Sequence, residues 1–282
     1  MATKRSRSAG LVLAAIVSGV GVGLSGGCAP NASHVDITGA DSVQTWTVCA
    51  VDVENYAGEV TVWVDPTLQQ PVIRCEKLVP GTAPSTHVST QVAATTSAVV
   101  SQADGRLVLR VTTRREEESQ AELVHLSVRV PSCDGLRIRN TGGMVRVEEV
   151  GGALDILNIG GINRLSPDVI VRTDREIVAP VSIISNGGGF VELSMSSESA
   201  GRLDLQGPRG FVEVKAERGR LESVRTDGIT FTGVLNRGEH SMKLRSDRGG
   251  VLVRLVKETQ PSPELAATSA PAPTGGGTAT QE

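Results

Sequence analysis

The chain has 282 residues, of which 28 are Lys or Arg and 31 are Asp or Glu, so the formal net charge is -3. The two signs are interspersed, which argues against the basic surface of a nucleic-acid-binding protein and against an acidic tail. Hydrophobic residues make up 39% of the chain but aromatic residues only 2%. This composition predicts a narrow core of stacked aliphatic side chains.

The N-terminus has the layout of an export signal. A basic segment at residues 4–7 precedes an apolar stretch at 9–24, and small residues then lead to Cys28. This resembles a bacterial lipoprotein signal, in which the cysteine is acylated and becomes the mature N-terminus, although Ser25 stands where a branched aliphatic residue is usual. We expect a signal peptide at residues 1–27 and a lipid on Cys28. Ordinary cleavage nearby and an uncleaved anchor are the alternatives.

Strands and turns dominate the rest of the chain. Residues 28–42 are polar and are predicted to be a tether, and from residue 43 apolar and polar side chains alternate in short runs. These runs include 46–53, 59–64, 107–111, 123–130, 136–139, 144–147, 153–156, 191–193, 203–205, 212–214, 229–232, 242–245 and 251–254. Residues 162–180 interrupt the spacing and predict an enlarged loop or an irregular rung. Residues 259–282 are rich in Pro, Ala, Thr and Gly and are predicted to be disordered.

Glycine recurs every nine residues at Gly201, Gly210, Gly219 and Gly228. Each glycine precedes a run too short to bury its own apolar face, whereas stacked runs would bury a continuous one. No comparable stretch has the three-and-four spacing of an amphipathic helix. The sequence therefore predicts an all-β fold, a single-domain β-solenoid at residues 43–258. It would be a right-handed β-helix-like stack with charged outer side chains in mixed-sign ladders.

The order of the motifs resembles one known family. A strand and glycine turn at residues 51–62, a Val-Arg-Val-Pro strand at 128–131 and a glycine-led strand pair at 136–147 are similar to the bacterial DUF4097, or adhesin-like, β-solenoid family. The resemblance covers roughly residues 46–256 and departs from the family where Met144 follows its turn glycine. It implies an exported, repetitive β protein at the cell envelope, and it carries over no catalytic residues.

Four cysteines are present, and acylation of Cys28 would leave Cys49, Cys75 and Cys133. An odd number in an exported protein suggests one disulfide and one spare thiol. Cys49 and Cys75 are the nearer pair and both lie in strand-like runs, so the sequence predicts a bridge between them, worth roughly 3 kcal/mol. No Cys-x-x-Cys motif is present and no cysteine has a histidine at ligand spacing, so no metal site is expected.

A polysaccharide-active enzyme is the one enzymatic alternative that the predicted fold offers. Right-handed β-helices include polysaccharide lyases and hydrolases, and glycoside hydrolysis needs two carboxylates a fixed distance apart. The candidates on outward positions are Asp155, Glu192, Asp204 and Glu213. These are also positions where any soluble solenoid carries charge, so we expect no catalytic residues, no cofactor and no enzyme.

Half of the aromatic residues lie close together in the sequence: Trp46, Tyr56 and Trp63. Because a solenoid needs its open end covered, these rings are predicted to form a cap, with a ligand-stacking surface as the alternative.

These patterns together favour a non-enzymatic, lipid-anchored protein of the bacterial cell envelope with a structural or adhesin-like role. Its expected partners are the membrane, through the lipid, and a protein or glycan at the envelope, with no nucleic acid. A polysaccharide-active β-helix enzyme and a periplasmic partner of an envelope-stress signalling system are the alternatives.

Overall fold

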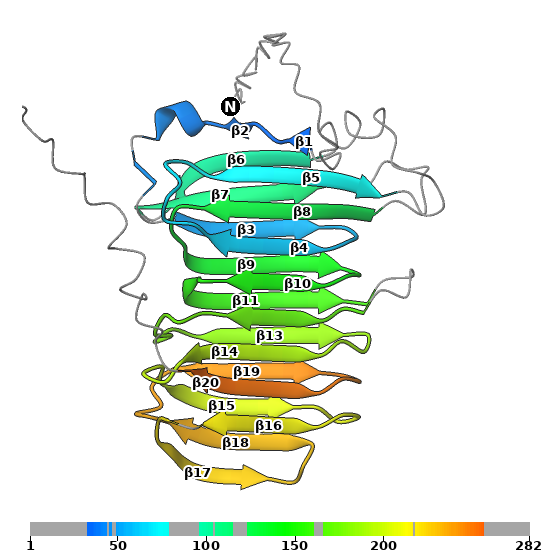
Figure 1. The fold of residues 1–282 in the computed structure, drawn as a ribbon, viewed down its shortest axis with the longest axis vertical. Coiled ribbons are helices and arrows are strands. Elements are labelled where there is room, and N and C mark those ends of the chain that lie inside the picture. The colour runs from blue at the N-terminus through cyan, green and yellow to red at the C-terminus, as the bar shows by residue number, and fades with distance from the viewer. Residues whose placement is uncertain are drawn as a thin grey trace, which may run out of the picture. The chain divides into compact units, whose positions relative to one another are not determined.

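The computed structural model describes residues 33–43, 45–46, 49–78, 96–103, 105–114, 123–160, 166–216 and 218–256. The chain divides into two compact units, Met1–Pro30 and Asn31–Glu282, and every described residue belongs to the second. These residues form twenty strands and a short 3-10 helix, η1 (Ala40–Ser42), with no α-helix among them (Figure 1). The predicted all-β class is confirmed. The predicted signal peptide and the predicted disordered tail lie outside the described residues.

The strands form two open sheets. The nine-stranded sheet has the spatial order β1 (Ser33–His34), β5 (Val72–Leu78), β8 (Leu123–Val130), β4 (Val60–Val64), β10 (Val145–Glu148), β12 (Val169–Arg172), β14 (Val191–Ser196), β20 (Val251–Val256), β16 (Val212–Ala216). The eleven-stranded sheet has the order β17 (Leu221–Thr226), β18 (Thr230–Leu235), β15 (Gly201–Gln206), β19 (Ser241–Ser246), β13 (Val181–Asn186), β11 (Gly151–Ile159), β9 (Asp134–Thr141), β3 (Cys49–Asn55), β7 (Arg106–Thr113), β6 (Thr96–Ala103), β2 (Ile37–Thr38).

Parallel pairing fills the middle of both sheets. All neighbours from β8 to β16 in the nine-stranded sheet and from β7 to β15 in the eleven-stranded sheet are parallel. Antiparallel pairs, such as β6 with β7 and β15 with β18, lie toward the ends. The chain passes between the sheets through short turns, as β3–β4, β9–β10 and β13–β14 illustrate (Figure 1).

Aliphatic columns explain how a core forms with so few rings. Inward positions on neighbouring strands are in register, so each column repeats one small set of branched side chains. One column of the nine-stranded sheet is Val60, Val145, Val169, Val191, Val251, Val212. A column of the eleven-stranded sheet is Val53, Ile138, Ile156, Ile183, Leu244, Leu205. The inward residues of these columns belong to one buried cluster, except Val212, which is partly buried and packs against it.

A second kind of column is polar and buried. Asn55, Asn140 and Asn158 are register partners at or next to the last positions of β3, β9 and β11. Each amide donates to the next: Asn55 Nδ2 to Asn140 Oδ1 and Asn140 Nδ2 to Asn158 Oδ1, both at 3.0 Å. Thr113 adds a hydroxyl donor to Asn55 Oδ1 at 2.6 Å. This asparagine ladder also donates to backbone carbonyls of the adjoining turns, such as those of Gly58 and Gly143. It therefore ties the turns of successive rungs together.

Three features differ from the sequence-based expectations. Part of the predicted tether forms the edge strands β1 and β2, which pair with β5 and β6. The predicted break at 162–180 contains β12, a regular strand paired in register with β10 and β14. The last strands are also out of order, because β19 inserts between β13 and β15 and β20 inserts between β14 and β16. The chain continues outward to β17 and then returns.

Candidate functional site

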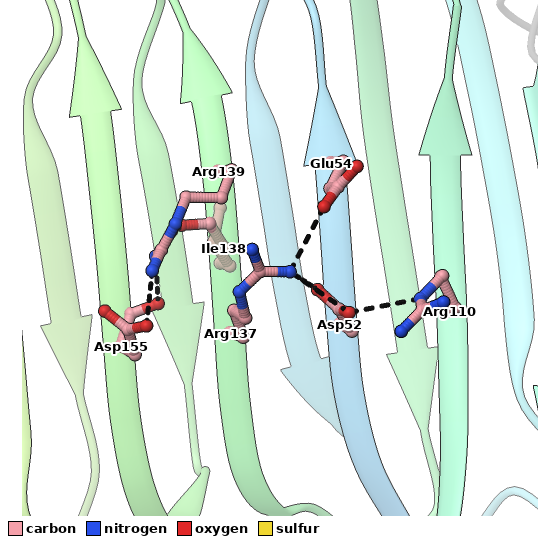
Figure 2. A network of polar contacts seen from close by, with 7 residues as sticks. All are labelled: Asp52, Glu54, Arg110, Arg137, Ile138, Arg139 and Asp155. Carbon is pink, nitrogen blue, oxygen red and sulfur yellow. Dashed lines mark hydrogen bonds and ion pairs between the residues drawn. The ribbon is translucent and has the colours of Figure 1, made fainter.

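A ladder of opposite charges crosses the outer face of the eleven-stranded sheet (Figure 2). Asp52 on β3 lies between Arg110 on β7, at 3.2 Å, and Arg137 on β9, at 2.9 Å. Arg137 also contacts Glu54 at 3.1 Å, and Arg139 pairs with Asp155 on β11. We call these six residues the charge ladder. Each ion pair joins residues on neighbouring strands that are either direct register partners or offset by two positions. Side chains at such positions point to the same face of the sheet.

The carboxylates beside Arg137 favour its charged form. Partial burial alone would lower the pKa of Arg137, but the carboxylates of Asp52 and Glu54 outweigh it, so that the pKa is raised. Exposed pairs of this kind each contribute about 1 kcal/mol or less to stability. The mixed-sign ladder predicted from the sequence is present. Each charged side chain in the ladder has a partner of opposite sign. We therefore interpret the ladder as a feature that fixes strand register and keeps the surface soluble, and not as a catalytic site.

A shallow groove of about 470 Å³ adjoins the charge ladder at the ends of β3, β7, β9 and β11. Its walls combine Glu54, Arg139 and Tyr56 with the apolar side chains of Leu157 and Ile159. Ile159 is 43% exposed. An open groove with mixed polar and apolar walls can accept a side chain or a short segment of a partner, but it does not enclose a small substrate.

The outer face of the nine-stranded sheet carries an aromatic and acidic patch. Phe190 and Glu192 precede or lie on β14, and Phe211 and Glu213 occupy the corresponding positions at β16. The two rings are 6.0 Å apart between centroids, and Phe211 is 49% exposed. Both glutamates pair with Leu252 on the intervening β20, so their Cα atoms are about 10 Å apart. We call these four residues the Phe-Glu patch.

Basic residues surround the glutamates of the Phe-Glu patch. Glu192 lies 3.4 Å from Arg172 and 3.9 Å from Arg254, and Glu213 lies 3.3 Å from Lys215. The patch thus offers ring faces together with hydrogen-bond donors and acceptors.

The four carboxylates singled out as catalytic candidates do not converge. Asp155 and Asp204 lie on strands of the eleven-stranded sheet that are separated by β13 and β19, whereas Glu192 and Glu213 lie on the nine-stranded sheet. A glycosidase mechanism needs a pair of carboxylates across one substrate. Of these residues, Glu192 and Glu213 are the pair that the structure brings to one local surface.

The predicted aromatic cap is wrong for Trp63. Trp46 is buried in the core, but Trp63 is 42% exposed on β4, which has neighbours on both sides in the sheet. The guanidinium of Arg129 stacks over its ring at 5.0 Å from the centroid. Arg129 is held in turn by Asp65, whose pKa is lowered by hydrogen bonds from Thr67 and then by Arg129. Trp63 therefore belongs to the outer face.

Cys49, Cys75 and Cys133 are all free, buried thiols, and the predicted Cys49–Cys75 disulfide is wrong because these two cysteines lie far apart. Cys75 contacts the hydroxyl of Thr96 at 3.1 Å, and Thr96 lies opposite Thr113, the residue that donates to Asn55. Asn55 ends β3 whereas Cys49 begins it, six residues earlier. Two ends of such a strand are roughly 20 Å apart, well beyond the span of a disulfide. Cys49 and Cys75 are the nearer pair in the sequence, but they are not close in the fold.

Other ligand chemistry finds little support in the described part of the chain. No group of three or more His, Cys, Asp or Glu side chains within it is arranged to hold a metal ion. No helix in that part is long and apolar enough to cross a bilayer. The predicted lipidation site, Cys28, lies outside the described residues.

Comparison with known proteins gives one structural likeness. Neither protein-family models nor curated proteins match the chain. A solved structure from Clostridium sporogenes, described as a "putative cell adhesion protein", superimposes with a TM-score of 0.53 at 8% identity, over 80% of this chain and 98% of that one. At this identity the likeness concerns the fold alone. The DUF4097 resemblance itself has no matching family model.

Proposed function

We propose that this protein is a non-enzymatic, lipid-anchored component of the bacterial cell envelope with an adhesin-like interaction role. The observation that carries the proposal is the pair of outer sheet faces, which present the charge ladder with its groove on one side and the Phe-Glu patch on the other. Such faces suit many weak contacts spread over a broad surface. The name given to the Clostridium structure is consistent with this role.

The chemistry of the faces supports binding over catalysis. The carboxylates of Asp52, Glu192 and Asp155 each lie within ion-pair distance of arginine. A general acid or base needs a carboxyl group directed at a substrate. A carboxylate held by guanidinium groups does not meet this requirement. The open groove beside the charge ladder likewise lacks the enclosure that catalytic sites use to exclude water.

We predict that the full chain fractionates with membranes and that the Cys28→Ser variant does not. The reason is that acylation supplies the anchor, and replacing sulfur by oxygen removes the acylation site. The measurement is membrane fractionation of cells fed a labelled fatty acid. Cys75→Ser, which changes a buried thiol on β5, is the matched control and should retain the label.

Protease treatment of the same intact cells tests the location. Digestion of the wild-type protein would support a surface role in adhesion, whereas protection would confine its partners to the periplasm. A Cys28→Ser protein that keeps the label and the membrane association would contradict the lipid anchor.

A second candidate function, contact with polysaccharide, is favoured by the Phe-Glu patch. The exposed ring of Phe211 can stack on a sugar face, while the charged groups beside it form hydrogen bonds with hydroxyls. Glu192 and Glu213 flank β20 in register on the same face of the sheet, so both carboxylates could contact one bound polysaccharide. The Phe-Glu patch is therefore the place to test whether the protein binds or cleaves polysaccharide.

We predict that Phe211→Ala weakens retention of the protein in polysaccharide-containing affinity gels about tenfold, because it removes the exposed ring. Val224→Ala is the control, since Val224 is exposed to a similar degree on β17 of the other sheet. Equal retention of both variants across the soluble polysaccharides tested would remove the second candidate. Release of reducing ends by the wild type, abolished by Glu192→Gln, would instead overturn the non-enzymatic proposal.

A further inference from the structure

Cys49 and Cys133 are neighbours in the fold although 84 positions separate them in the sequence. Strands β3 and β9 are parallel neighbours, with Val51 opposite Leu136. Extending this register backward places Cys49 beside Asp134, the residue that follows Cys133. Strand spacing and rise then put the two cysteine Cα atoms roughly 6 Å apart. This separation is in the range that disulfides span.

The environment of the two sulfurs is closed and shared. Cys49 and Cys133 are 0% and 1% exposed and belong to the same core cluster. Each thiol donates to a nearby carbonyl, Cys49 to Ala50 and Cys133 to Gly135. A Cβ placed on Gly135 would lie 3.9 Å from the Cβ of Ala50, so the two segments are in contact beside the sulfurs.

Electrostatics agree with this placement. Burial raises the pKa of Cys133 to about 12, and Cys49 is the next largest cause of the increase. Burial likewise raises the pKa of Cys49. Once the fold is complete both thiols are therefore protonated and shielded from solvent, as inert buried thiols are, so a bridge between them has to form before folding is complete.

We propose that Cys49 and Cys133 form a structural disulfide when the chain folds under oxidising conditions, and that Cys75 remains the spare thiol. One disulfide and one free thiol are still expected, but the partner of Cys49 is Cys133 and not Cys75. The bridge would link the start of β3 to the start of β9, where the central parallel sheet begins to stack, whereas Cys75 stays with Thr96 near the opposite end of β3.

The reaction needs a disulfide oxidant, and glutathione disulfide is sufficient. One protein thiolate attacks glutathione disulfide and releases a glutathione thiolate, and the second protein thiolate then displaces the other glutathione from the mixed disulfide. Two protein thiols and one glutathione disulfide thus give one protein disulfide and two glutathione thiols, with the two protons transferred to the glutathione. Because both sites are buried in the folded chain, the step must precede the completion of folding.

The test is to refold the full chain carrying Cys28→Ser from denaturant with reduced and oxidised glutathione. Trypsin cleaves after Arg129 and Arg137 and after Arg74 and Lys77, so Cys133 and Cys75 fall in separate peptides. We expect one reactive thiol per chain in denaturant without reductant. We also expect a linked Cys49–Cys133 peptide pair about 2 Da lighter than its reduced parts. The melting temperature should fall by roughly 5 °C or more on reduction.

Two variants keep the result interpretable. Cys75→Ser should keep the linked peptides and lose the last reactive thiol, and Cys133→Ser should show two reactive thiols. Three reactive thiols in the refolded parent, or any linkage that contains Cys75, would overturn the proposal. Because the refolding is carried out in solution, its failure would leave the proposed location and adhesin-like role untouched, and they are tested separately on cells.

Discussion

Replacing Asn140 by alanine is expected to lower the free energy of unfolding by about 4 kcal/mol. Asn140 is 2% exposed and lies in the middle of the asparagine ladder, where it accepts from Asn55 and donates to Asn158. Its amide also donates to the backbone carbonyls of Gly58 and Gly142. Alanine leaves these groups without their partner in a dry environment, which costs more than the loss of the bonds alone.

Urea unfolding followed by tryptophan fluorescence measures the effect, since Trp46 is buried in the core and becomes exposed on unfolding. The matched control is Asn186→Ala, which makes the same change at the exposed end of β13 and should cost less than about 0.5 kcal/mol. If the two variants unfold at the same urea concentration, the asparagine ladder contributes no special stability. If Asn140→Ala alone lowers the free energy of unfolding strongly, the asparagine ladder is a main source of the stability of the turns.

The asparagine ladder also shows where sequence reasoning stops. Asn55, Asn140 and Asn158 each follow alternating apolar residues and stand two or three positions before a glycine, which is a recognisable repeated signal. Taken singly, however, asparagine before glycine is an ordinary turn residue that faces solvent. The buried role appears when three strands are placed in register, because each amide then meets the next at hydrogen-bonding distance.

The aliphatic columns were easier to predict, for a related physical reason. Val60, Val145 and Val191 alternate with polar residues along their own strands, so a period of two identifies the buried face without knowledge of the neighbours. Pairing between distant strands is a different kind of information. The cysteine partners and the insertion of β19 and β20 depend on which strands meet, and local periodicity does not encode that choice.

Replacing Gly143 by alanine is expected to cost about 4 kcal/mol or more, or to prevent folding. Gly143 lies in the β9–β10 turn at φ +85°, and its backbone packs on the preceding turn so closely that a Cβ would lie 2.5 Å from the carbonyl oxygen of Gly58. Two costs therefore add: the strain of a left-handed residue, about 1–2 kcal/mol, and a steric overlap with backbone that has no free rotamer to relieve it.

A second glycine separates these two costs. Gly105, in the β6–β7 turn, has a similar φ of +76°, but a Cβ at this position would meet nothing within 4 Å, so Gly105→Ala carries the strain alone and should cost about 1 kcal/mol. The difference between the two unfolding free energies then measures how tightly one turn packs on the next. Equal losses would mean that the turns yield easily and that the sheets alone hold the stack. If the Gly143 variant is much less stable than the Gly105 variant, the rungs stack only when successive turns pack closely. The asparagine ladder holds the same turns through hydrogen bonds to their carbonyl groups.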